Sequence, residues 1–331
     1  MATTTRRFMP YIRIALLAGS LWALRREFAG VSLASLLRQL AGHGWARVAA
    51  GIAATVLSFL LLGGVELLAL HTTLAGVRRI PRRIAMATAF VAHAMSQSVG
   101  LALLTGAAVR MRAYERRGMD AAQVGSASAL VTLGVTLGLV AAAAWAFLAE
   151  GAPMVVRGHA LAVRPIGVLL ALMVVAYFAW SIFGSSRVGA KSRWHIPRPA
   201  PAIALALMLL ATADWLMSGA VLYVFLPSDT HIPIWGFMRT YIVAQTVGVT
   251  SHVPAGAGVF EVVLLGLLTT AYPSVDRAAF LAAIVLYRAV YYLLPLCAAV
   301  ALAGITELLR SRRGASHRAA PFTQAEVEVA T

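Results

Sequence analysis

Three carboxylic acids stand inside long apolar stretches of this sequence: Glu66, Asp214 and Glu261. An acidic residue at the centre of a membrane helix costs ~2.5–3.5 kcal/mol on insertion scales, so it usually faces an interior cavity or a basic partner. Such side chains could contact a cationic group or carry a proton along a polar path, or they could form structural ion pairs. For Glu261, which closes a glycine-rich segment and could brace it, the two alternatives stay equal.

Three arginines are available as partners of opposite charge for these acids: Arg110, Arg112 and Arg288. Arg110 ends one interrupted apolar stretch, and Glu261 lies near the matching point of another. These two residues could form a gate pair, or each could bind one part of a zwitterionic ligand. Arg288 lies in a tyrosine-rich stretch, where its charged end could instead extend to the membrane surface.

Neutral polar residues accompany the interruptions of the apolar stretches. Gln97 and Gln245 each precede a predicted helix break. Their amides could bind a ligand headgroup or brace the unwound backbone, and bracing is the favoured interpretation for either one alone. His252 is a candidate proton carrier, although a histidine that satisfies the polar groups of a broken helix is the favoured interpretation.

The elements that must position these residues are membrane helices. The chain has 331 residues, of which 60% are apolar and 12% charged, against roughly 25% charged in an ordinary soluble domain. This composition excludes a soluble enzyme, a disordered protein and a coiled coil. It predicts an all-α polytopic membrane protein. We expect six full crossings, at Ile14–Leu24, Ala46–Leu70, Ala121–Leu148, Pro165–Phe183, Pro201–Leu226 and Ala278–Leu309.

Two further apolar regions, Ile84–Arg110 and Ile234–Ala271, are interrupted by polar residues, glycine and proline. Non-helical backbone at membrane depth is tolerated only where it is buried in protein or lines a cavity. We therefore interpret both regions as re-entrant hairpins of broken helices. The residues expected to break the helices are Gly100, Gly106, Pro254, Gly256 and Gly258.

The net charge of +16 comes from basic residues in short loops, which is how membrane proteins set their orientation. Arginines lie on both sides of the first hairpin, at 78–83 and at 110–117, and a hairpin places both groups on one side. This pattern predicts that both termini are cytoplasmic and that nucleic acid is not a partner. Residues 1–9 are then a cytoplasmic N-terminus, 10–310 the membrane domain, and 311–331 a disordered cytoplasmic tail.

An internal repeat relates the two hairpins. The sequence QSVG at 97–100 recurs as QTVG at 245–248, and GAAV at 106–109 recurs as GAGV at 256–259. Glu66 and Asp214 each lie 31 residues before the corresponding glutamine, which favours a functional role for both. Three crossings separate the hairpins, so repeat unit one (46–149) and repeat unit two (201–309) are predicted to be inverted, as in secondary transporters.

Enzyme signatures are missing from the sequence. It contains no His-Glu-x-x-His zinc motif, no Gly-x-Ser-x-Gly elbow and no phosphate-binding glycine-rich loop. We therefore expect a protein that is not an enzyme and that needs no metal or cofactor.

Four stretches resemble the transmembrane domain of the lysylphosphatidylglycerol synthase/flippase family (multiple peptide resistance factor). They read HAMSQSVG at 93–100, LTGAAVR at 104–110, AQTVGVTSHVPAGAGVFE at 244–261 and LYRAVYYLLP at 286–295. The resemblance implies a protein of the bacterial inner membrane that moves an aminoacylated phosphatidylglycerol to the outer leaflet. Such movement reduces the negative surface charge and confers resistance to cationic peptides.

The family's full-length members continue into a cytoplasmic transferase domain, whereas this chain stops soon after its last predicted helix. We therefore expect the flippase half alone, with a membrane phospholipid as substrate. A separately encoded aminoacyl-phospholipid synthase and a second copy of the chain are candidate partners. Two alternatives stay open: a non-transporting subunit that anchors or regulates a lipid-modifying enzyme, and a small-solute transporter.

Overall fold

The computed structural model describes residues 44–74, 80–99, 102–149, 154–156, 159–161, 163–184, 198–227, 231–251, 254–256, 258–273 and 277–318. The first predicted crossing, Ile14–Leu24, and the N-terminal segment 1–9 lie outside these residues. So do Gly100, His252 and the last part of the predicted tail, 319–331.

Helices make up almost all of the described chain. The α-helices are α3 (Trp45–Leu74), α4 (Arg82–Val99), α5 (Ala102–Tyr114), α6 (Ala121–Leu148), α7 (Arg164–Phe183), α8 (Pro201–Val224), α9 (Ile234–Thr250), α10 (Val259–Ala271), α11 (Arg277–Tyr287) and α12 (Leu294–Arg318). Two 3₁₀ turns, η1 (Glu115–Arg117) and η2 (Pro254–Gly256), and one π-helix, η3 (Arg288–Leu293), connect some of them. A small antiparallel hairpin of β1 (Met154–Val156) and β2 (His159–Leu161), which no sequence pattern predicts, lies between α6 and α7 in the chain.

Five helical segments of the described chain are long and apolar enough to cross a membrane. They are Trp45–Leu74, Ala121–Leu148, Arg164–Phe183, Pro201–Val224 and Ala279–Thr306. These correspond to five of the six predicted crossings, and the chain is a multi-pass α-helical membrane protein.

The helix α6 lies at the centre of the bundle and α7 at its edge: 61% of the apolar window of α6 is buried, against 11% of that of α7. Close contact between α6 and α8 depends on Gly138, where a Cβ atom would lie 2.6 Å from the backbone carbon of Ala211. Small residues let membrane helices approach closely in this way. Close packing matters because lipid is as apolar as the helix surfaces, so the hydrophobic effect does not drive the helices together.

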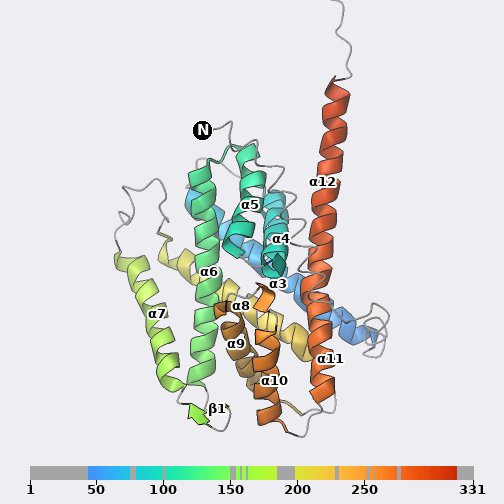
Figure 1. Ribbon diagram of the computed structural model, residues 1–331. Helices are drawn as coiled ribbons and strands as arrows, with labels where there is room; N and C mark the ends of the chain where they lie inside the picture. The colour runs from blue at the N-terminus through green and yellow to red at the C-terminus, as the bar shows by residue number, and fades with distance from the viewer. Residues whose placement is uncertain are drawn as a thin grey trace, which may run out of the picture.

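Figure 1 shows two short helix pairs that occupy opposite ends of the molecule. The pair α4–α5 lies in the upper half, and α9–α10 lies in the lower half. The helix α4 also packs against η2, the turn between α9 and α10, so the two pairs meet inside the bundle. The same order of elements therefore occurs twice, in opposite directions: α3, α4–α5, α6 and α8, α9–α10, α11–α12.

The interruption between α9 and α10 lies where the sequence predicts it. Ala255 has φ 56°, in the left-handed region that ordinary residues rarely adopt. Gly256 (φ 63°) and Gly258 (φ 83°) adopt positive φ angles without steric penalty. Pro254 begins the turn η2, so the break combines a proline with two glycines.

The prediction that Gly106 breaks the first hairpin is wrong, because Gly106 lies inside α5. A Cβ atom at this position would lie 2.8 Å from Nη1 of Arg110 and 3.0 Å from Oγ of Ser96. Glycine is needed here to leave space for the guanidinium group and for the approach of α4. The helix α4 ends at Val99 and α5 begins at Ala102.

The C-terminal helix is longer than the sequence predicts. We expected disorder from Ser311 onward, but α12 continues to Arg318. Adding a residue to an existing helix costs little because the unfavourable nucleation step is already complete.

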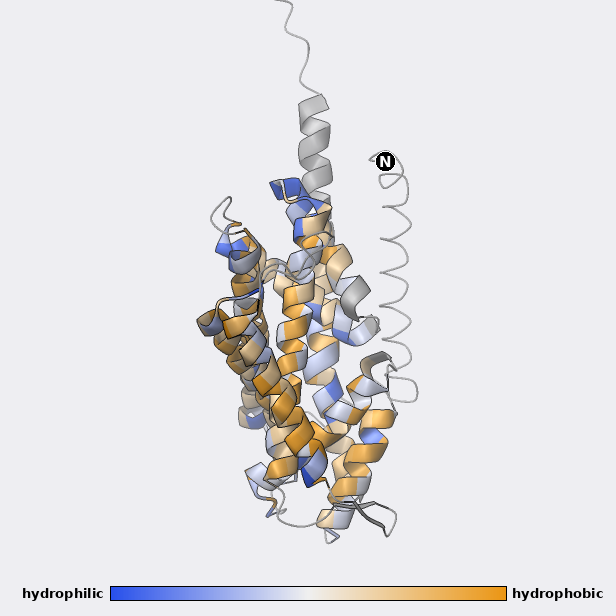
Figure 2. Ribbon diagram, turned by 90° about the vertical axis from the view of Figure 1, so that its left-hand side faces the viewer, coloured by the Kyte–Doolittle hydropathy of each residue, from blue (hydrophilic) through white to orange (hydrophobic). Residues whose placement is uncertain are grey.

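The outer surface of the bundle is apolar. Figure 2 shows apolar residues along the bodies of the helices and hydrophilic ones concentrated toward the two ends. On α7 the exposed large side chains include Leu169, Leu172 and Val175. An exposed apolar belt of this kind is what a helix facing lipid requires.

Candidate functional site

The first buried charge cluster joins α3 to α5. Arg110 donates from Nε and Nη2 to Oε2 of Glu66, at 2.8 and 2.7 Å. Tyr114, one helical turn after Arg110, donates its hydroxyl to Oε1 of Glu66 at 2.7 Å. Glu66 is 0% exposed and Arg110 is 4% exposed. Both carboxylate oxygens therefore have charged or hydroxyl donors, which a buried ion pair requires.

The imidazole of His93, on α4, lies beside this cluster, with Nε2 3.5 Å from Nη2 of Arg110. This position agrees with a structural role, because one ring nitrogen contacts the guanidinium group where α4 and α5 meet.

The second charge cluster braces the break in the other hairpin. Arg288, in the π-helix η3, donates from Nε to Oε1 of Glu261 at 2.8 Å and from Nη1 to the carbonyl oxygen of Ala255 at 3.0 Å. Glu261 in turn accepts from the backbone N–H of Gly258 at 2.7 Å, at the start of α10. One carboxylate and one guanidinium thus hold the non-helical segment in place.

Aromatic rings surround this second pair. The guanidinium carbon of Arg288 lies 4.6 Å from the ring centroid of Tyr292 and 5.5 Å from that of Phe260. The Glu261 side chain is nevertheless 23% exposed, while that of Arg288 is only 5% exposed. The second pair is therefore more accessible than the first.

The third acid, Asp214, has a different environment. It lies on α8, is 2% exposed, and accepts a hydrogen bond from the hydroxyl of Ser58 on α3. The same hydroxyl is 2.9 Å from the hydroxyl oxygen of Tyr291, on η3. No ion pair formed between described residues includes Asp214.

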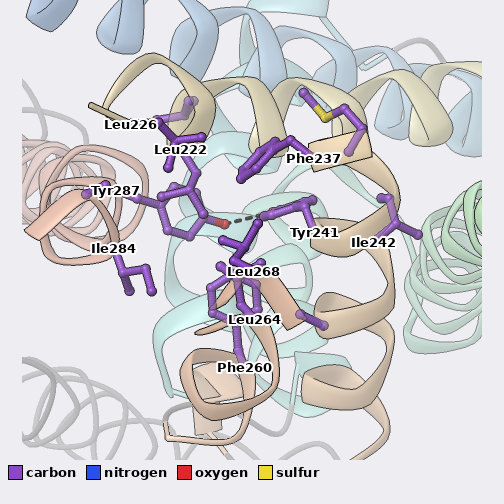
Figure 3. Packing of buried hydrophobic residues seen from close by; sticks show 14 of the residues in the cluster. Leu222, Leu226, Phe237, Tyr241, Ile242, Phe260, Leu264, Leu268, Ile284 and Tyr287 are labelled. Atoms are coloured by element: carbon purple, nitrogen blue, oxygen red, sulfur yellow. Dashed lines mark hydrogen bonds between the residues drawn. The ribbon is translucent and has the colours of Figure 1, made fainter. Parts of the chain in front are cut away.

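A second network of hydroxyl groups begins at Ser218, one helical turn after Asp214 on α8. Ser218 is hydrogen-bonded to Tyr241 at 2.6 Å and to Tyr287 at 3.0 Å, and the two tyrosine oxygens are 2.9 Å apart. Figure 3 shows Tyr241 and Tyr287 pointing toward one another among apolar side chains of the core. The rings of Tyr287 and Tyr291 stack with centroids 5.5 Å apart, so the two networks adjoin.

Two of the charge arrangements that the sequence left open do not occur in the structure. Arg110 and Glu261 do not form a gate pair, because Arg110 binds Glu66 and Glu261 binds Arg288. Arg288 does not extend to the membrane surface. Its guanidinium group is buried, where it is paired with Glu261 and packs on aromatic rings. Each arginine instead pairs with an acid of its own repeat unit.

The two glutamines lie near the ends of the first helices of the hairpins. Gln97 is in the last turn of α4, and its Oε1 is buried with no hydrogen-bond partner among the described residues. Gln245 lies on α9 and is 8% exposed. His252 and Gly100 lie outside the described residues.

Sequence reasoning missed the hydroxyl groups that complete these clusters. Ser58, Ser218 and Tyr241 are common membrane-helix residues, and no local pattern marks them. A signal did exist for Tyr114, which follows Arg110 at the i+4 spacing that places two side chains on one helix face. The described residues contain no group of histidine, cysteine or acidic side chains that could hold a metal ion.

A relative in Synechocystis decides the family. The uncharacterized protein slr0712 is 32% identical over 298 residues, which cover 89% of this chain and 90% of that protein. The chain belongs to the same family. Escherichia coli inner membrane protein YbhN is 25% identical over 250 residues, covering 74% of this chain and 75% of the E. coli protein.

Phosphatidylglycerol lysyltransferases match a smaller part of the chain. The Staphylococcus epidermidis enzyme is 34% identical over 96 residues and the Staphylococcus aureus enzyme 33% identical over 102 residues. These matches cover 28% and 30% of this chain but only 11% and 12% of the enzymes. A comparison with described protein families finds no match.

Proposed function

We propose that this protein moves a phospholipid with a charged headgroup, such as lysyl-phosphatidylglycerol, between the leaflets of a bacterial inner membrane. The name of the E. coli relative supports this location, and the short matches to phosphatidylglycerol lysyltransferases support a lipid substrate. In this proposal the chain is not an enzyme, both termini are cytoplasmic, and a separate synthase supplies the lipid.

The observation that carries the proposal is the Glu261–Arg288 pair at the break between α9 and α10. Its carboxylate is 23% exposed, whereas the Glu66 carboxylate is fully buried. A headgroup with an amine and a phosphate could exchange partners with this pair: the phosphate would bind Arg288 and the amine would bind Glu261. The acyl chains would stay in the lipid beside the apolar helices.

The opposed hairpins explain why such a site would serve transport. The pairs α4–α5 and α9–α10 approach from opposite ends and meet where α4 packs against η2. Inverted repeats whose broken helices meet inside a bundle are suited to alternating access. A headgroup bound at the meeting point could be exposed to one side and then to the other.

Reconstitution of the purified protein into liposomes tests this proposal. A fluorescent analogue of lysyl-phosphatidylglycerol is placed in both leaflets, and a membrane-impermeant reductant bleaches the outer one. Flipping is expected to bleach the inner pool in wild-type vesicles, and the variant Arg288→Gln is expected to lose most of this activity. The exposed substitution Glu115→Gln is the matched control.

The two alternatives give other outcomes. If the lipid does not move in vesicles with folded protein, but a lipid-modifying enzyme is retained by it, the protein is a membrane subunit. If the vesicles take up a small solute without lipid movement, the protein is a solute transporter.

A further inference from the structure

Asp214 differs from the other membrane acids because its recorded partner is a hydroxyl group. Its side chain is 2% exposed, and Ser58 donates to its Oδ1. Glu66 binds Arg110, and Glu261 binds Arg288. Asp214 is thus the buried acid for which the described residues supply no neutralising cation.

The cost of burial decides which form this acid prefers. Moving an ionised carboxylate into an apolar interior is very unfavourable unless a cation or several donors compensate for the lost water. A carboxylic acid that holds its proton avoids this cost and still hydrogen-bonds to a hydroxyl group. The geometry therefore favours a residue that binds and releases a proton over one that binds a fixed charge.

The hydrogen bonds around Asp214 can reverse when it changes protonation state. With an ionised carboxylate, Tyr291 donates to Ser58 and Ser58 donates to Asp214. With a protonated carboxyl group, Asp214 donates to Ser58 and Ser58 donates to Tyr291. Ser58 keeps one donated and one accepted bond in both states, and Tyr291 changes from donor to acceptor. The two hydrogen bonds of the chain therefore persist in either form.

Among the described residues, the side chains recorded against Asp214 are hydroxyl groups, and the charged residues of the helices packed on α8 are bound elsewhere. Arg239 of α9, for example, donates to the carbonyl oxygen of Ala149. On α3 the ionic residue closest in sequence to Ser58 is Glu66, eight residues away and bound to Arg110. The sequence of α6, which packs against α8, contains no acidic or basic residue.

Helices on the other side of α8 add tyrosines. Tyr241 from α9 and Tyr287 from α11 both bond to Ser218, and Tyr291 of η3 faces Ser58. The ionic residue of η3, Arg288, is bound to Glu261. The edge helix α7 has Arg164 as its first residue, with the apolar stretch following it.

We infer that Asp214 is a proton-binding site, and that proton release and uptake there couple lipid movement to the transmembrane proton gradient. The coupling part of this inference rests on the proposed lipid transport, whereas the proton site can be tested alone.

Infrared difference spectroscopy on protein with isotope-labelled aspartate tests the proton site. The chain has four aspartates, and each gives a labelled carbonyl band when it is protonated. A pH change is expected to produce one such band that Asp214→Asn abolishes. Asp120→Asn is the control, because Asp120 caps α6 and asparagine caps equally well. Ser58→Ala should move the midpoint pH of the band. A set of labelled acid bands that is the same in Asp214→Asn as in the wild type would overturn the assignment.

Transport under an imposed pH gradient tests the coupling. Vesicles are clamped at zero membrane potential with an ionophore, and the fluorescent lipid is counted in each leaflet. With one proton per lipid, a gradient of one pH unit can sustain a ratio of about tenfold between leaflets. Asp214→Asn should still equilibrate the lipid but build no asymmetry.

Each remaining outcome is decisive. The coupling would be overturned if Asp214→Asn built the same lipid asymmetry between leaflets as the wild type. It would also be overturned if the pH gradient did not change the lipid distribution that the wild type produces. Absence of any wild-type lipid movement would overturn the proposed function instead, and the infrared band would still decide whether Asp214 binds a proton.

Discussion

Glu66 and Asp214 occupy corresponding positions of the two repeat units, yet they have opposite environments. Both lie 31 residues before a glutamine, and both are almost completely buried. Glu66 is neutralised by Arg110 and accepts a hydrogen bond from Tyr114, whereas Asp214 receives a hydrogen bond from Ser58. The same place in a repeat therefore holds a buried ion pair in one unit and a candidate proton site in the other.

The largest expected effect comes from breaking the ion pair. Glu66→Ala leaves Arg110 buried without a counter-charge, and we expect the free energy of unfolding to fall by about 3–5 kcal/mol. Denaturant unfolding in detergent measures this change. The double variant Glu66→Gln with Arg110→Gln should recover a large part of it. A loss no larger than that of Asp214→Asn would remove the contrast between the two acids.

Removing one donor from the same carboxylate should have an intermediate effect. Tyr114→Phe deletes the hydroxyl that is 2.7 Å from Oε1 of Glu66, and hydrogen bonds to charged groups are worth about 1.5–3 kcal/mol. The unfolding free energy should fall by a similar amount. Tyr177→Phe, on the edge helix α7, is the control and should change it little.

The more accessible pair should tolerate neutralisation better. Glu261→Gln keeps an acceptor for Arg288, which also bonds to the Ala255 carbonyl and packs on two rings. We expect a loss of about 1 kcal/mol in unfolding free energy, together with a clear loss of lipid movement. Loss of stability equal to that of Glu66→Ala would indicate that the second pair is also purely structural.

The smallest change in stability is expected for Asp214→Asn. An amide of the same shape can accept from Ser58 and leaves no buried charge unpaired, so the unfolding free energy should change by less than about 1 kcal/mol. The same unfolding titration measures it. Destabilisation by several kcal/mol would indicate a hidden cation near Asp214 and would contradict the comparison.

Sequence patterns predicted much of this architecture because membrane helices obey a simple length and hydropathy rule. The crossing predicted at Ala121–Leu148 matches α6 residue for residue, and Pro165–Phe183 differs from α7 by one residue. The break at Pro254–Gly258 was also predictable, since proline and positive-φ glycines are local signals. Gly106 was misinterpreted because a glycine that gives space to a side chain has the same sequence signature as one that breaks a helix.

The amino-acid sequence is enough to identify the titratable groups, the apolar stretches and the places of two similar hairpins. It also placed Glu66 and Asp214 at one position of the repeat. The partners of these acids cannot be read from the sequence, because Arg110 is 44 residues from Glu66 and Ser58 is 156 residues from Asp214. Helix packing brings such distant side chains together, and local spacing carries no record of it. The packing, through the partner it supplies, therefore decides whether a buried acid stays ionised or becomes a site for a proton.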